Sequence, residues 1–79
     1  MYFVYILKSL KGSSYYVGFS TDPERRLKEH NRGIVGSTKS KQPYVKVWSC
    51  VFEDKMRALA FEKYLKSGSG IAFYRKRLI

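Results

Sequence analysis

The sequence predicts a small α+β domain whose elements run in the order strand, strand, helix, strand, helix, helix. Residues 2–10 and 15–20 are rich in β-branched and aromatic side chains and are separated by a short glycine-containing turn. Helix-start signals follow at residues 21–24 and again at residues 53–54. A chain of 79 residues has room for one core, so we expect a single domain over residues 1–79.

The first two segments predict an antiparallel hairpin. Along residues 2–10 both faces of the strand are apolar, which indicates a strand that is covered on both sides. The turn at residues 11–14 leads into a second strand over residues 15–20. Gly18 lies inside this second strand, where a glycine indicates a bulge or a close approach of another group to the backbone.

The first helix is expected to start at residues 21–24, with Thr21 as the N-cap of a capping box and a proline in the first turn. Gly33 is expected to end it as a C-cap residue. Arg26 and His30 are four residues apart and therefore share one face of this helix. A solvated helix face is the alternative interpretation of that pair.

The remaining elements follow from composition. Residues 33–43 predict a loop because they are rich in Gly, Ser, Thr and Lys, and residues 44–52 predict a third strand. A second helix is expected to open at the acidic residues 53–54 and to end at residues 67–68. After a further turn, a last helix is expected over residues 71–78.

The charge balance points to an anionic partner. Sixteen Lys and Arg residues stand against six Asp and Glu, which gives a formal net charge of +10 at pH 7. Such an excess on a small domain collects polyanions, so nucleic acid is the leading partner. An anionic membrane surface or an acidic protein comes second, and a merely solvated basic surface is the remaining alternative.

Other classes of protein are disfavoured. No apolar stretch approaches the roughly 18 residues of a membrane span, and no N-terminal signal peptide is visible. Cys50 is the single cysteine, so no internal disulfide can form and a reduced, cytoplasmic setting is expected. One Cys and one His are too few for a zinc site.

Three side chains have the character of site residues. Glu62 falls within the apolar arc of the second predicted helix, beside Phe61 and Leu65, where a carboxylate is costly unless it is paired or binds a cation. An edge position that reaches water or an Arg is the alternative. Tyr5 and Tyr16 lie on adjacent predicted strands, which could bring their rings together, although ordinary cross-strand packing would do the same.

In this order and spacing, the residues resemble the GIY-YIG nuclease family. The matching pieces are Phe3-Val4-Tyr5, then Tyr16-Val17-Gly18 eleven residues beyond that Tyr, then Arg26, His30 and a downstream helix that carries Glu62. The chain is especially similar to the small, single-domain, uncharacterised endonuclease branch, over residues 2 to about 70. It departs from the family pattern in having Phe3 where the family name has Gly, and no Asn beyond Asn31.

The resemblance implies a three-stranded antiparallel sheet flanked by helices. It also implies hydrolysis of DNA phosphodiester bonds with one divalent cation, Mg²⁺ or Mn²⁺. Carried over by position, Glu62 would ligate the metal and Arg26 would stabilise charge on the scissile phosphate. Tyr5 and Tyr16 would line the site, and one of them would deprotonate or orient the attacking water. His30 would hydrogen-bond in the same cluster.

Basic residues around such a site are expected to contact DNA, namely Lys8, Lys11, Arg25, Lys39 and Lys41. Gly18 would let the substrate backbone come near its strand, and Tyr44 could stack on a base, whereas core packing is expected for Trp48. Two other functions stay open from sequence alone. One is a non-catalytic nucleic-acid-binding module that retains the fold, and the other is a basic adaptor for an acidic protein.

Overall fold

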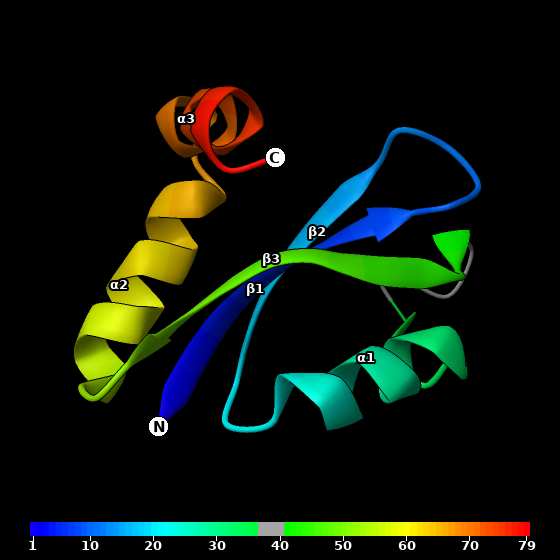
Figure 1. The fold of residues 1–79 in the computed structure, drawn as a ribbon, viewed down its shortest axis with the longest axis horizontal. Helices are drawn as coiled ribbons and strands as arrows, with labels where there is room; N and C mark the ends of the chain where they lie inside the picture. Colours follow the sequence, from blue (N-terminus) through cyan, green and yellow to red (C-terminus); the bar gives the residue numbers. More distant parts are fainter. Residues whose placement is uncertain (37–40) are drawn as a thin grey trace.

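The sheet is three-stranded and antiparallel, as the resemblance implied. The computed structural model describes residues 1–36 and 41–79. Its strands are β1 (Tyr2–Ser9), β2 (Tyr15–Ser20) and β3 (Tyr44–Phe52), arranged in the order β2-β1-β3 (Figure 1). The first strand is therefore the central one, and β2 and β3 form the two edges of the sheet.

Helices cover both faces of this sheet. They are α1 (Pro23–Asn31), α2 (Lys55–Leu65) and α3 (Gly68–Arg77). Figure 1 shows α1 on one side of the sheet and α2 with α3 on the other. The expected α+β class and the element order β-β-α-β-α-α are thus confirmed. Over the two described stretches, no helix is both long enough and apolar enough to cross a membrane.

The larger core lies between the sheet and α2 with α3. Val4 and Ile6 are fully buried there and cluster with Ala58 and Leu65 of α2, which are also fully buried. Trp48 of β3 packs against the same cluster, so its expected core position is confirmed. The apolar stripe predicted for the second helix is the surface that holds this core together.

A smaller core lies under α1. Tyr5 and Leu7, the alternate residues of β1, are buried with Tyr44, and Tyr16 and Leu27 pack against them. The expectation that β1 is covered on both sides is therefore confirmed. Tyr44 is only 4% exposed, so the expectation that its ring stacks on a base is wrong. Its side chain is part of the smaller core beneath α1.

Two helix starts differ from the sequence predictions. The N-cap of α1 is Asp22 rather than Thr21, because the Asp22 carboxylate accepts a hydrogen bond from the backbone N–H of Arg25 at 3.2 Å. The last helix begins at Gly68, three residues before the predicted start, because the Ser67 hydroxyl accepts from the Gly70 N–H at 3.1 Å and caps it.

Candidate active site

The candidate site is built around the phenol of Tyr5. Tyr5 lies opposite Gly18 in the β1–β2 pairing, and it is 1% exposed. A Cβ placed on Gly18 would lie 2.4 Å from the Tyr5 hydroxyl oxygen, so the phenol ring crosses β2 in the space that a side chain would fill. The approach expected at Gly18 is therefore made by Tyr5, and the expectation that substrate uses this space is wrong.

Helix α1 places His30 against this phenol. His30 is fully buried, and its Nε2 lies within hydrogen-bonding distance of the Tyr5 hydroxyl, at 3.3 Å. The ring of Tyr16 meets the imidazole edge-on, with 4.6 Å between ring centroids. Burial lowers the pKa of His30, and the nearby Arg26 lowers it further, while Glu29 acts in the opposite direction. The imidazole is therefore neutral near pH 7.

One turn earlier on the same helix, Arg26 reaches the cluster. Its charge acts on Tyr5 and Tyr16, which shows that the guanidinium lies near both phenols. Glu29 accepts a hydrogen bond from Arg26 Nη1 at 2.7 Å, and this bond lowers the pKa of the Glu29 carboxyl. About a third of the Arg26 side chain, 34%, is still exposed. Glu29 thus binds the guanidinium of Arg26, and the exposed part of the Arg26 side chain remains accessible to a ligand.

Helix α2 brings Glu62 to the same place from the opposite layer. The Glu62 side chain is 19% exposed, and its Oε2 accepts from Lys66 Nζ at 3.0 Å. The Lys66 ammonium also lies 5.9 Å from the centroid of the Tyr16 ring. The charge of Glu62 makes the smallest contribution to the raised pKa of Tyr5, so the carboxylate lies in the wider electrostatic surroundings of that phenol.

The two tyrosines are not equivalent. Burial raises the pKa of the Tyr5 phenol to about 12, Tyr16 adds to that increase, and the Arg26 guanidinium opposes it. Tyr5 therefore keeps its proton at neutral pH and can donate a hydrogen bond but cannot act as a base. Tyr16 is only half-buried and lies on an edge strand. Of the two phenols, it is the more exposed one, and its ring lies beside the Lys66 ammonium that is paired with Glu62.

The structure gathers four of the five predicted side chains, Tyr5, Tyr16, Arg26 and His30, into one cluster. Glu62 borders this cluster through Lys66, whose ammonium faces the Tyr16 ring. Sequence reasoning missed two partners, Glu29 and Lys66. The sequence spacing could have predicted both of these pairs. Glu29 stands three residues after Arg26, and Lys66 stands four residues after Glu62, which are spacings at which side chains on one helix meet.

Two of the expected DNA-contacting residues share one pocket. Lys11 and Lys41 line a pocket of about 290 Å³ at the β1–β2 turn, together with the hydroxyls of Ser9 and Ser14. Lys41 Nζ donates to Ser14 Oγ at 2.9 Å, which fixes that ammonium over the turn.

The other predicted contacts lie outside this pocket. Lys8 is exposed on β1, one residue before the strand ends. Arg25 is exposed on α1 and pairs with Glu29 at 3.4 Å, so it borders the candidate active site. Lys39 lies outside the residues that the structure describes.

The donor set suits a hard cation that keeps most of its water. In residues 1–36 and 41–79, no three His, Cys, Asp or Glu side chains gather as ligands for a fully enclosed metal. Mg²⁺ needs few protein ligands, and one accessible carboxylate with a substrate oxygen is a normal set for it. Glu62 supplies that carboxylate, and the ammonium of Lys66 already lies against it. Glu62 thus fits a cation of this kind.

This chain belongs to the GIY-YIG catalytic domain family, whose model matches residues 1–71. A UPF0213 protein from Clostridium perfringens is 39% identical over 84% of this chain and 71% of its own length. A UPF0213 protein from Vibrio campbellii is 36% identical over 80% of this chain. The structure-specific endonuclease subunit slx1 of Schizosaccharomyces pombe is 40% identical over 95% of this chain.

The matched region is only part of some relatives. It covers 61% of the Vibrio protein and 30% of the fission-yeast protein. No solved structure gives a significant match.

Proposed function

We propose that this protein is a divalent-metal-dependent endonuclease that hydrolyses DNA phosphodiester bonds by attack of water. The observation that carries the proposal is the cluster of Tyr5, Tyr16, Arg26 and His30, with Glu62 at its border through Lys66. Those groups come from both layers of the fold, which ordinary packing does not require. Membership of a catalytic-domain family supports the same conclusion, as does similarity to the yeast structure-specific endonuclease subunits.

Glu62 would hold the cation, Mg²⁺ or Mn²⁺, after Lys66 leaves its carboxylate. When bound, such a cation neutralises charge on a phosphate and makes a bound water more acidic. Lys66 would remain close, because it follows Glu62 by one helical turn. Its ammonium would then be available for a phosphate oxygen of the substrate.

Each of the other side chains in the cluster would have a separate role. Arg26 would bind the scissile phosphate with two parallel hydrogen bonds, and Glu29 would keep the guanidinium aimed at it. Tyr5, which stays protonated and is 1% exposed, would act as a positioning residue that holds His30 in place through their hydrogen bond. Tyr16 would accept a hydrogen bond from the attacking water and orient it toward the phosphorus. The single-metal mechanism needs no further carboxylate.

Substrate binding would draw on the net charge of +10 and on the lysines at the β1–β2 turn. Phosphates of one strand would then be held on both sides of the scissile bond. We propose structured or damaged DNA as the substrate class. The unpaired thiol of Cys50 suits a reducing cytoplasm, where we place the protein.

A plasmid-nicking assay tests the proposal. Wild-type protein should nick supercoiled DNA with Mg²⁺ or Mn²⁺ and not with EDTA. Glu62→Gln should abolish nicking and leave DNA binding intact, whereas Glu53→Gln, the same change at an exposed position just before α2, should behave like wild type. Equal nicking by the Glu62 and Glu53 variants would overturn the assignment.

A non-catalytic nucleic-acid-binding module is the second candidate. It is favoured by the internal pairing of both key charges, because Arg26 is bound to Glu29 and Glu62 is bound to Lys66. Phe3 in the first motif points the same way. This alternative predicts salt-sensitive DNA binding without metal-dependent strand breaks on plasmid, branched or single-stranded DNA. Metal-dependent breaks that require Glu62 would exclude it.

A further inference from the structure

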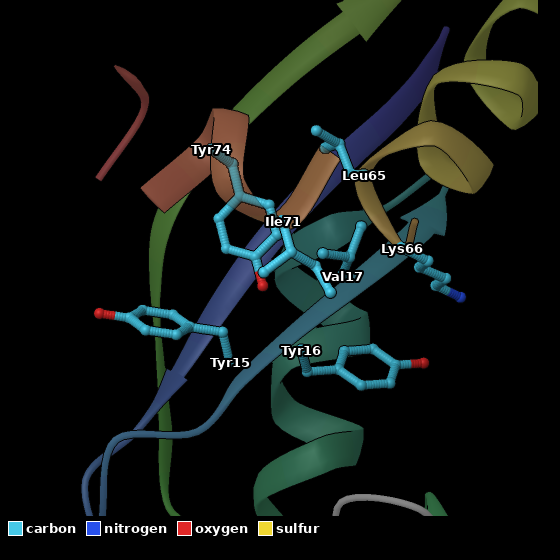
Figure 2. Close-up of a pocket in the computed structure, with 7 residues that line it drawn as sticks. All are labelled: Tyr15, Tyr16, Val17, Leu65, Lys66, Ile71 and Tyr74. Atoms are coloured by element: carbon cyan, nitrogen blue, oxygen red, sulfur yellow. The ribbon is translucent and has the colours of Figure 1, made fainter. Parts of the chain in front are cut away.

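A second pocket lies at the outer edge of β2, next to the candidate active site. Its volume is about 230 Å³. Its walls are residues 15–17 of β2, Leu65 and Lys66 at the end of α2, and Ile71 and Tyr74 of α3 (Figure 2). Of these residues, Tyr16 and Lys66 have roles in the proposed active site, and the others have none.

The pocket and the active site share a wall. Figure 2 shows the rings of Tyr15 and Tyr16 pointing to opposite sides of β2, with the Lys66 side chain on the Tyr16 side. Tyr16 contacts His30 in the catalytic cluster, and Lys66 is bound to Glu62. A group bound in the pocket would therefore lie directly beside a group bound in the active site.

The lining matches a flat ring that is attached to phosphates. Tyr15 and Tyr74 meet edge-on with 6.1 Å between ring centroids, and the aliphatic Ile71 lines the same pocket, so the interior offers aromatic and aliphatic groups. Lys66 is the cation among the lining residues, and Arg75, outside the lining, lies 5.6 Å from the centroid of the Tyr15 ring. The volume is below the roughly 300–1,000 Å³ of pockets for drug-sized molecules, which suits a single ring system.

We propose that this pocket binds one unpaired nucleobase of the DNA strand that is being cut, with an adjoining phosphate in the active site. The inference rests on the proposed function and specifies its substrate. A base inside a duplex must be unstacked and unpaired before it can enter, whereas a base in a gap, flap or loop is already free. The pocket would therefore make the protein prefer DNA with unpaired bases at the cleavage point over continuous duplex.

Matched variants in the non-cleaving Glu62→Gln background test this preference. Ile71→Glu puts a carboxylate into the pocket, and Phe73→Glu makes the same change in charge on the same helix outside it. The two positions are comparably exposed, at 36% and 37%. Dissociation constants are measured by fluorescence anisotropy for a duplex and for the same duplex with a short unpaired segment, and circular dichroism checks that each variant is folded.

The parent should bind the DNA with unpaired bases roughly 5- to 150-fold more tightly than duplex, the factor that corresponds to about 1–3 kcal/mol of base stacking. Phe73→Glu should weaken both complexes equally and keep this ratio, whereas Ile71→Glu should bring it close to 1. A fluorescent 2-aminopurine in the unpaired segment should be quenched by the parent and not by Ile71→Glu.

Each other outcome overturns the assignment. An unchanged ratio in Ile71→Glu, or an unquenched 2-aminopurine with the parent, removes the base pocket and leaves DNA binding standing. Light scattering that shows a dimer, abolished by Ile71→Glu, would assign the pocket to a second copy of the chain. Absence of binding to either DNA by the parent would defeat the proposed function itself.

Discussion

Replacing Gly18 by alanine tests whether the position of Tyr5 depends on the missing side chain. The new Cβ would lie 2.4 Å from both Cζ and Oη of Tyr5 and 2.8 Å from Cε1. These atoms belong to a rigid ring that is 1% exposed, so no flexible chain end can move aside. The phenol as a whole must shift, and with it the hydrogen bond to His30.

The expected loss of stability follows from two opposing terms. Overpacking of this kind costs about 1–3 kcal/mol, and the lower entropy of the unfolded alanine chain offsets about 0.4–1 kcal/mol. The net loss is therefore at most about 2.6 kcal/mol, which lowers the thermal unfolding midpoint of a domain of this size by up to roughly 20 °C. Gly12→Ala is the matched control, because no heavy atom lies within 4 Å of the Cβ that it would add.

Two measurements decide the outcome. Thermal unfolding should separate Gly18→Ala from Gly12→Ala, and the nicking rate of Gly18→Ala should fall about 100-fold, the usual effect of misplacing a catalytic group by about 1 Å. In the double variant Tyr5→Leu with Gly18→Ala, the shorter side chain should relieve the clash, so the stability loss should be less than additive while nicking stays low. A Gly18→Ala protein with wild-type stability and rate would refute the geometry.

Three other effects are expected. The pKa of His30 is lower in the folded state than in the unfolded chain, so protonation below about pH 6.5 favours unfolding. The thermal unfolding midpoint should therefore fall as pH drops from about 6.5 to about 5, and His30→Gln should lose most of this decrease. A midpoint that is flat over this range in wild type would contradict the buried neutral imidazole. Replacing Lys11 and Lys41 by Gln should make the slope of log K against log salt less negative by about 1.8, measured by anisotropy, if each contacts one phosphate. An unchanged slope would remove the turn pocket from the DNA interface. Gly70→Ala should cost about 3 kcal/mol or more in urea unfolding, since its Cβ would lie 1.8 Å from the backbone oxygen of Tyr64, which cannot move without the helix. Stability equal to wild type would place α3 differently against α2.

The layering of the fold was predictable because it depends on strand parity alone. Once residues 2–10 are a strand, Val4 and Ile6 must share one face while Tyr5 and Leu7 share the other. All four are buried, in two separate cores. No knowledge of the helices is needed for this step, which explains why the sequence pattern was sufficient.

The helix starts were harder because neighbouring residues compete to cap them. Thr21 and Asp22 can both accept a hydrogen bond from a helical N–H, and the local signals conflict, because Asp is the stronger N-cap residue while the capping-box spacing to Glu24 favours Thr21. In the folded chain the Ser20 hydroxyl accepts from the Asp22 N–H at 2.9 Å, which holds the chain so that Asp22 is the residue at the cap. Gly68 and Gly70 lie in the first turn of α3 and are poor helix formers, so the sequence does not indicate where this helix starts. Its position depends on packing against α2.

The roles within the site show where sequence reasoning ends. Tyr5 and Tyr16 are the same residue type, and nothing in their spacing says which of them is buried and which faces solvent. The sheet distinguishes them, because Tyr5 lies on the central strand under α1 and Tyr16 lies on an edge strand. Burial then raises the pKa of Tyr5 to about 12, while Tyr16 keeps contact with solvent and with the Lys66 ammonium.

The same edge position makes Tyr16 the link between the catalytic cluster and the proposed base pocket. A strand that enters this edge would place a base against one side of β2 and a phosphate against the other. The edge strand would therefore do two tasks that a central strand could not, since only its outer side is open to a polymer. Strand order, which neither the composition nor the motif spacing specifies, is what distinguishes the two tyrosines: Tyr5 is buried beside His30, and Tyr16 lies at the edge that would face the substrate.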